Sequence, residues 1–419
     1  MFQTIVNAFK LKDVRKKILI TILLLFIYRL GCYIPVPGVE TVNLEGFSFL
    51  QIMSAISGSA LSYGTFFAMG IGPYINASII IQLLSVAIPR LQALSKQGEE
   101  GRRKINNITR VVTLILAIAQ AVGILVGVTT IEHNHLFGEG VKALNYIFLV
   151  LVYASGAALT MWIGERITDY GISNGISLLI FAGLLSSAGT AIISLFTNWT
   201  DSSIWTIVGF LIAAILIFGA ITFVHNAERK VLVQYAKQVK GRKMYGGQST
   251  HIPMKVNSAG VMPLIFSFSI LSFPDLITSL LGWETSWWQR NLGTGSWAYI
   301  PVLCLLILFF SYFYNQMQFN PDDVSKSIQG NGGFIPGIRP GKPTADYLKK
   351  TSNRITLFGA IFLALVALIP SIIFKAVGGE GLANVFSATG LLIIVSVALE
   401  FEQALQSQIM MKNYKGFLK

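Results

Sequence analysis

The chain has 419 residues, of which 53% are hydrophobic and 12% are charged, and its formal net charge is +13. A soluble domain usually has about 25% charged residues, whereas a protein surrounded by lipid needs few of them. The composition therefore excludes an ordinary soluble domain and predicts a membrane protein. Taken alone, the positive charge leaves nucleic acid, anionic lipid and cytoplasmic loops open as explanations.

The N-terminal segment, residues 1–17, predicts a short amphipathic helix on the cytoplasmic surface. Its apolar residues Phe2, Ile5, Val6 and Phe9 recur at helical spacing and precede a basic cluster. The apolar run that follows is longer than the core of a signal peptide and has no small-residue cleavage site. We therefore expect this run to be the first membrane span.

Apolar runs long enough to cross a bilayer recur along the chain. A crossing takes ~20 mostly apolar residues. The expected spans are 18–34, 71–88, 111–128, 145–164, 176–196, 204–224, 259–280, 298–318, 355–375 and 386–408. The fold class is therefore an all-α polytopic membrane protein with ten transmembrane helices.

Basic residues are sorted between alternate loops. Segments 1–17, 89–110, 165–174, 226–256, 319–354 and 412–419 hold 28 of the 32 lysine and arginine residues. Positive residues mark the cytoplasmic side of a membrane protein, so both termini are expected there. This sorting explains the net charge without nucleic acid.

Residues 46–89 contain no Asp, Glu, Lys or Arg, and this stretch is about twice as long as one crossing. Two crossings would place segment 35–45, which has no basic residue, and segment 89–110, which has six, on the same side. One crossing that starts near Pro73, preceded by a re-entrant piece, fits better, because proline suits the first turn of a helix. Re-entrant backbone is tolerated where protein or a water-filled cavity surrounds it. A long kinked helix with a lead-in at the membrane surface is the alternative.

Ionisable residues are nearly absent from the expected spans. Arg29 lies toward the outer end of the first span, where it is expected to snorkel. No central carboxylate pair or histidine relay favours an ion-coupled solute transporter, which nevertheless stays open as a second class, with a membrane scaffold or intramembrane enzyme as a third. His133 and His135 are too short a pattern for a metal site, and the phosphate-loop-like stretch 336–343 has Pro343 where Ser or Thr is required. No cofactor, metal or enzymatic activity is expected.

Two long loops, 226–256 and 319–354, are expected to be cytoplasmic docking surfaces, with solvated linkers as the alternative. The first predicts a short strand pair around its Gly-Arg turn, and the second is rich in glycine and proline. The halves of the chain, 18–200 and 201–411, carry five spans each, so their topologies are inverted.

Five stretches of the chain resemble the SecY family of protein-export channels. They are 70–84 (GIGPYINASIIIQLL), 98–104 (GEEGRRK), 161–176 (MWIGERITDYGISNGI), 248–257 (QSTHIPMKVN) and 334–341 (FIPGIRPG). The resemblance runs in order along essentially the whole chain.

The resemblance implies an hourglass pore between the two halves, through which unfolded preproteins pass. The re-entrant piece, residues ~53–68, would then be a plug helix that blocks the outer funnel; we call these residues the plug segment. Its implied residues are Ser57, Gly58, Ala60, Leu61, Tyr63, Gly64, Phe66 and Phe67. The implied constriction is a ring of aliphatic side chains, Ile75, Ile79, Ile180, Leu184, Ile265 and Ile393.

The resemblance also implies a lateral gate and a set of partners. Hydrophobic segments would leave sideways into lipid through a gate between the halves, where Gln82, Gln120 and Asn257 are candidate polar residues. Arg242, Lys243 and Arg339 would contact the SecA motor ATPase or the ribosome. SecE and SecG would be the small partner subunits, preprotein signal sequences and membrane lipid would be ligands of the gate, and the location would be the bacterial plasma membrane.

Overall fold

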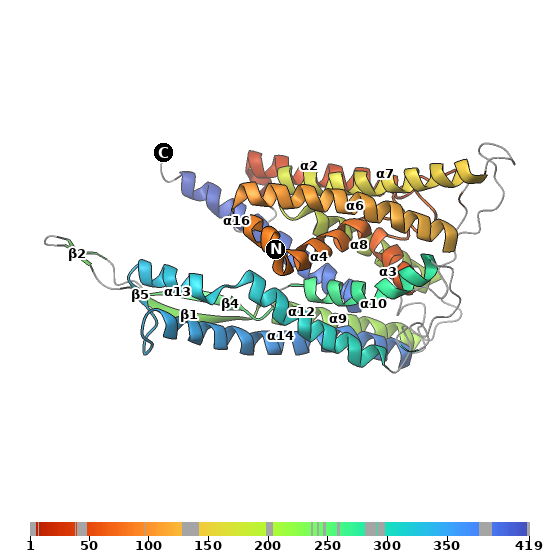
Figure 1. The fold of residues 1–419 in the computed structure, drawn as a ribbon. Coiled ribbons are helices and arrows are strands. Elements are labelled where there is room, and N and C mark those ends of the chain that lie inside the picture. Colours follow the sequence, from red (N-terminus) through yellow and green to blue (C-terminus); the bar gives the residue numbers. More distant parts are fainter. Residues whose placement is uncertain are drawn as a thin grey trace.

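The computed structural model describes the chain apart from a set of short segments. These are residues 1–5, 7, 38, 40–47, 96, 128–141, 198–203, 236–237, 241–242, 246–248, 258–259, 281–290, 292–297, 377–387 and 417–419. Most of the described residues are helical, as Figure 1 shows. In the N-terminal segment, Phe2 and Ile5 lie outside the described part, while Val6 and Phe9 are exposed in helical backbone.

Ten described helices overlap the ten expected spans one by one. They are α2 (Lys12–Gly31), α4 (Gly72–Ala87), α6 (Glu99–Gly127), α7 (Lys142–Tyr170), α8 (Gly175–Thr197), α9 (Ile204–Asn226), α10 (Met262–Leu280), α12 (Tyr299–Gln318), α14 (Lys342–Ala376) and α16 (Ala388–Gly416). By length and composition alone, five of the described helices could each cross a membrane, and α4 together with α5 (Pro89–Ser95), bent by 105°, would make a sixth. Pro73 lies in the first turn of α4, as predicted.

The helices group into two bundles of five. Helices α2, α4, α6, α7 and α8 contact one another, and so do α9, α10, α12, α14 and α16. The bundles meet where α6 contacts α10 and where α8 contacts α16; in Figure 1, α2, α6 and α7 lie in the upper part of the view and α12 and α14 in the lower part. Each bundle is a continuous stretch of the chain, so the site between them is built from both halves.

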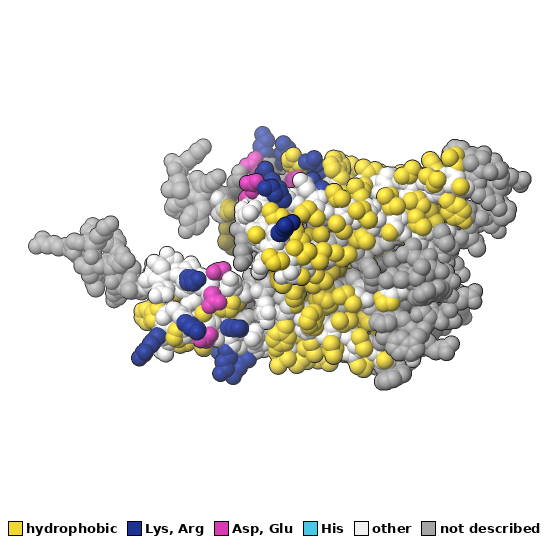
Figure 2. All heavy atoms as spheres, viewed as in Figure 1, with side chains coloured by type: hydrophobic (Ala, Val, Ile, Leu, Met, Phe, Trp, Pro, Cys, Tyr) yellow, Lys and Arg dark blue, Asp and Glu magenta, His cyan; other side chains and the backbone are white. Residues whose placement is uncertain are grey.

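Large apolar side chains cover the outside of both bundles. Phe26 on α2, Ile115 on α6 and Phe358 on α14 are each about 60% exposed, which is expected where lipid is the solvent. In Figure 2 hydrophobic side chains cover the middle of the molecule, whereas charged side chains gather toward one end. This separation matches the sorting of basic residues that the sequence predicts.

The segment 226–256 folds into strands beyond the membrane helices. Strand β1 (Glu228–Tyr235) lies between β4 (Ser249–Lys255) and β5 (Gly333–Phe334) in an antiparallel sheet. Its register places Glu228 opposite Lys255. The predicted strand pair around the Gly-Arg turn is confirmed as β2 (Gln238–Lys240) and β3 (Lys243–Tyr245), while the longer β1–β4 pairing was not predicted.

The two long loops form one folded unit and not two separate surfaces. Helix α13 (Pro321–Gly330) begins after Asn320, whose side chain accepts a hydrogen bond from the Asp322 N–H at 3.2 Å. Helix α14 begins at Lys342, inside the segment expected to be loop. A buried apolar cluster joins the pieces: Val231, Val233, Met254, Ile328, Ile335 and Leu348. We call β1, β4, β5, α13 and the start of α14 the sheet unit.

Leu348→Ala is expected to lower the free energy of unfolding of the sheet unit by about 2–5 kcal/mol, because Leu348 is fully buried and the truncation leaves a cavity. The measurement is protease sensitivity of segments 226–256 and 319–354 in membrane vesicles. Leu357→Ala, at an exposed position of the same helix, is the control. Unchanged protease resistance in Leu348→Ala would show that this cluster does not hold the two loops together.

Candidate functional site

A short helix lies between the two bundles. Helix α3 (Ser48–Ser57) contacts α8 of the first bundle and α10 of the second. The chain that follows is also largely buried, with Ala60, Leu61, Phe67 and Ala68 no more than 5% exposed. The structure therefore encloses this segment in protein, as the re-entrant prediction requires, and does not lay it along the membrane surface.

The helical part of the plug segment is shorter than predicted. Helix α3 ends at Ser57 because Gly58 and Ser59 both adopt positive φ angles, of 70° and 67°. The Ser59 N–H donates to the Ser54 carbonyl at 2.7 Å and the Gly58 N–H to the Ala55 carbonyl at 3.2 Å. This pattern is a Schellman cap, and the chain continues in turns as far as α4.

The implied plug residues are mostly buried in these turns. Ser57, Gly58, Ala60, Leu61, Gly64 and Phe67 are buried, Phe66 is half-buried and Tyr63 is exposed.

The turns after α3 are tied to the end of α2. The Phe66 N–H donates to the Ile34 carbonyl at 2.9 Å, and the Val36 N–H donates to the Gly64 carbonyl at 3.1 Å. The Phe67 ring stacks on Tyr28 at 5.7 Å between centroids. These contacts supply partners to backbone groups that would otherwise be unpaired at membrane depth.

The six residues predicted for the aliphatic ring come together from four helices. Ile180 and Leu184 of α8 and Ile393 of α16 are buried in one cluster, against which Ile75 of α4 and Ile265 of α10 pack. Ile79 of α4 is buried in an adjoining cluster, which Ile75 also contacts. The structure thus places all six where the two bundles meet.

A hydrogen bond joins α4 to α12 across the bundles. The Tyr314 hydroxyl donates to Gln82 Oε1 at 2.8 Å, and Gln82 Nε2 donates to Ser78 Oγ at 3.2 Å. The Tyr314 ring also packs edge-on against Phe266 of α10, 5.3 Å between centroids. Sequence reasoning found Gln82 but missed Tyr314, since one tyrosine in an aromatic-rich span gives no distinct signal.

The other two predicted gate residues lie apart from this bond. Gln120 is buried on α6, and its Oε1 has no hydrogen-bond partner among the described residues. Asn257 follows β4 and lines a small cavity with Ser311 and Asn315 of α12. Within the described chain, no hydrogen bond links Gln82, Gln120 and Asn257 to one another.

A polar pocket of about 380 Å³ opens beside Gln82. Its walls come from α4, α6 and α12, and they include Tyr74, Ser78, Gln82, Arg102, Asn106 and Tyr314. Arg102 belongs to the first turn of α6, in the basic segment 89–110. The pocket therefore leads from the charged end of the molecule to the junction between the bundles.

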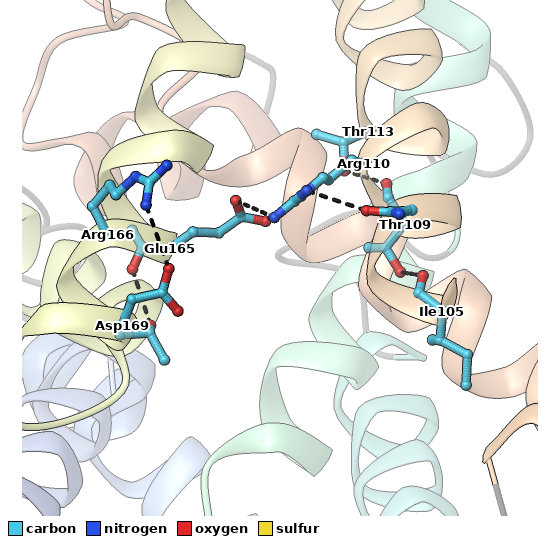
Figure 3. Close-up of polar contacts among 10 residues, drawn as sticks. Ile105, Thr109, Arg110, Thr113, Glu165, Arg166 and Asp169 are labelled. Atoms are coloured by element: carbon cyan, nitrogen blue, oxygen red, sulfur yellow. Dashed lines mark hydrogen bonds and ion pairs between the residues drawn. The ribbon is translucent and has the colours of Figure 1, made fainter. Parts of the chain in front are cut away.

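Helix α6 is fastened to α7 by an ion pair (Figure 3). Arg110 Nε donates to Glu165 Oε1 at 2.7 Å and its Nη2 to Glu165 Oε2 at 2.8 Å. A two-pronged pair of this kind holds orientation as well as distance. The pair therefore couples the position of α6 to that of α7.

Arg339 is presented at the surface of the sheet unit. Its side chain is exposed, whereas the nearby Ile335 is buried and anchors the loop. The Thr344 hydroxyl also donates to the Arg339 carbonyl at 2.8 Å. Arg242 lies outside the described residues, and Lys243 is described by its backbone alone, in β3.

Comparisons with known proteins agree with this architecture. The SecY family model matches residues 65–402. A "Protein translocase subunit SecY" from Streptomyces griseus is 42% identical over 446 residues, covering 100% of both chains. One from Corynebacterium glutamicum is 40% identical over 443 residues, covering 99% of both.

Solved structures show the same fold at low sequence identity. One described as a protein conducting channel has a TM-score of 0.69 at 20% identity, covering 94% of this chain and 92% of its own. A SecY structure solved to study the plug domain has a TM-score of 0.62 at 18% identity and the same coverage.

The fold defines a class, the ten-helix membrane channels with a plug held between two halves. Within that class, the chain belongs to the SecY family.

Tyr314→Phe is expected to loosen the contact between α4 and α12, because it removes the bond to Gln82 and keeps the ring. A bond of this kind contributes about 0.5–1.5 kcal/mol, so the open state should become roughly two- to tenfold more populated. The measurement is the rate of disulfide formation between Ser85→Cys and Met317→Cys, which line the pocket from α4 and α12 and should cross-link more slowly when the two helices part. Tyr312→Phe, on the same helix, is the control; equal rates in Tyr314→Phe and wild type would contradict the prediction.

Proposed function

We propose that the protein is the central subunit of a protein-conducting channel. It passes unfolded preproteins across the plasma membrane and releases hydrophobic segments sideways into lipid. The observation that carries this proposal is the buried plug segment between two five-helix bundles. The relatives' shared description as protein translocase subunits supports it.

The aliphatic ring is suited to hold a passing chain without binding it. Side chains such as Ile79, Ile180 and Ile393 offer no hydrogen bonds, so a polypeptide of any sequence can slide past them. When no chain is present, an apolar constriction excludes water and ions by dewetting. The plug segment closes the path beside this ring, and it moves aside when a preprotein enters.

The gate lies where α4 and α6 face α10 and α12. Across this contact the Gln82–Tyr314 hydrogen bond joins the halves, and the polar pocket beside it opens between α4, α6 and α12. A signal sequence would enter here, with its apolar part between the bundles and lipid beyond. Gln120, which is buried on α6, and Asn257, which lines a cavity against α12 and α14, would be further polar residues near this gate.

The sheet unit is the docking surface for cytosolic partners. Arg339 would contact the SecA motor ATPase or the ribosome, and Arg242 and Lys243 would act in the neighbouring loop. Both termini face the cytoplasm in this proposal, and SecE and SecG complete the complex in the plasma membrane. The family's activity is transport without catalysis, so the energy comes from a partner or from the membrane potential.

Deleting Ala55 to Phe67 is expected to turn a nearly silent protein into a large, poorly selective ion conductor, because it removes the enclosed segment that fills the path. The measurement is ion conductance of the purified protein with its small partner subunit in a planar bilayer.

Equally low conductance of both proteins, in samples shown to be folded and inserted, would count against residues 55–67 as the main seal. Proton- or sodium-coupled solute uptake by the protein alone in liposomes would instead favour a secondary transporter.

Arg339→Glu is expected to reduce export of a reporter preprotein at least tenfold while leaving insertion and abundance of the protein intact, because it reverses an exposed charge without disturbing buried Ile335. Export and abundance are measured in the same cells. Lys350→Glu, an exposed residue on α14, changes the net charge equally and serves as the control. Normal export in Arg339→Glu would contradict the proposal that Arg339 contacts a cytosolic partner.

A further inference from the structure

Arg29 is the charged residue of the first span that was expected to snorkel, and the structure places it differently. It is half-buried near the end of α2. Its guanidinium lies over the Tyr33 ring at 4.8 Å from the centroid and reaches across to the plug segment. An ionisable side chain at membrane depth that turns inward is a candidate functional group.

The guanidinium binds the end of the plug helix. Arg29 Nη1 and Nη2 each donate to the Gly58 carbonyl at 3.3 Å, and Nη2 also contacts Ser186 Oγ of α8. Among the described residues no carboxylate pairs with Arg29; besides this carbonyl it contacts the hydroxyls of Ser186 and Tyr33, the Tyr33 ring and the Cys32 thiol. The charge is therefore directed at backbone of the plug segment and not at another ion.

The contact is electrostatically favourable because of where α3 ends. The last carbonyls of a helix carry a partial negative charge, which a cation near the C-terminus stabilises. Gly58 is the first residue after α3, at the left-handed position of the Schellman cap, and its carbonyl, which lies just beyond the last helix carbonyls, accepts from Arg29. A side chain at position 58 would collide with the guanidinium, since a Cβ there lies 2.2 Å from Arg29 Nη1.

Helix α8 completes the seat from the other side. The Ser187 hydroxyl donates to the Ala55 carbonyl at 3.0 Å. Gly183, one turn earlier, lies so close to α3 that a Cβ there would be 1.8 Å from the Ile56 carbonyl oxygen. Gly183, Ser186 and Ser187 share one face of α8. The C-terminal turn of α3 is therefore held between this face and Arg29.

We propose that Arg29 is a positioning residue that latches the plug segment shut by capping the C-terminus of α3 against α8. This inference rests on the proposed plug function. To leave its seat, the plug must exchange charge-assisted hydrogen bonds for other partners, which holds the resting channel closed. The bonds are few, so a preprotein entering the pore can displace them.

The test is single-channel conductance of the complex with its small partner subunit, for Arg29→Met in the full chain and in the chain lacking Ala55 to Phe67. In the full chain, Arg29→Met is expected to raise the open-to-closed ratio roughly ten- to a hundredfold, the range expected for hydrogen bonds to a charged group. In the plug-deleted chain the same substitution should change nothing, because no plug remains to be held. Arg29→Lys keeps the positive charge but loses the paired N–H donors of the guanidinium, and it is expected to raise the open-to-closed ratio less than Arg29→Met does.

Arg166→Met is the matched control, since Arg166 also lies over aromatic rings, at 5.5 Å from Trp162, but makes no described contact with the plug segment. If Arg29→Met leaves the conductance of the full chain unchanged while the deletion of Ala55 to Phe67 raises it, the role of Arg29 is refuted and the plug function is not. An equal rise from Arg29→Met in both backgrounds would also refute that role, because the effect would then be on the pore wall. If the deletion of Ala55 to Phe67 does not raise the conductance, the proposed plug function is refuted, and the role of Arg29 is refuted with it.

Discussion

The constraint on which this structure depends is that backbone N–H and C=O groups at membrane depth must find partners inside the protein. After Ser57 the chain leaves the helix and stays irregular until α4. Ile34 and Val36, just after α2, and Arg29 of α2 supply partners to this stretch, while Ser187 of α8 binds the last turn of α3. The two bundles have to enclose this irregular stretch of chain. The space between the bundles that holds the stretch is also the space through which a path can run.

The contacts across the bundles differ in kind from those within one. Arg110 and Glu165 fasten α6 to α7 with two charged bonds, whereas the hydrogen bonds described between the halves are neutral, from Tyr314 to Gln82 and from Gln408 to the Ile172 carbonyl. Neutral bonds contribute about half as much as charged ones. The aliphatic residues between the bundles add apolar contacts that have no preferred direction. These contacts persist when one bundle shifts along the other. The weaker surface therefore runs between the bundles, where a channel must open, while each bundle keeps its own shape.

The spans were predictable because lipid demands long apolar helices, so hydropathy carries the signal over every crossing. The re-entrant segment was predictable from missing charge, and the start of α4 from Pro73. Features set by distant residues were not. Gly58 ends α3 where the composition suggested more helix, β1 finds β4 by pairing across an intervening hairpin, and Arg29 meets partners on α8 that lie 157 positions away.

The residues proposed for docking and for the gate lie within one continuous stretch of chain. Helix α12 carries Tyr314 at the gate, and it leads through Asn320 into α13 and then to Arg339. The return helix α14 is bound to α12 by the buried hydrogen bond from Asn315 Nδ2 to Ser352 Oγ, at 2.8 Å. A partner bound to the sheet unit would therefore act on both helices together, and α12 is the one that holds the hydrogen bond to α4. The plug is coupled differently, through α2 and α8 in the other bundle, so the two closures can respond to different signals: one to a partner at the surface, the other to a chain in the pore.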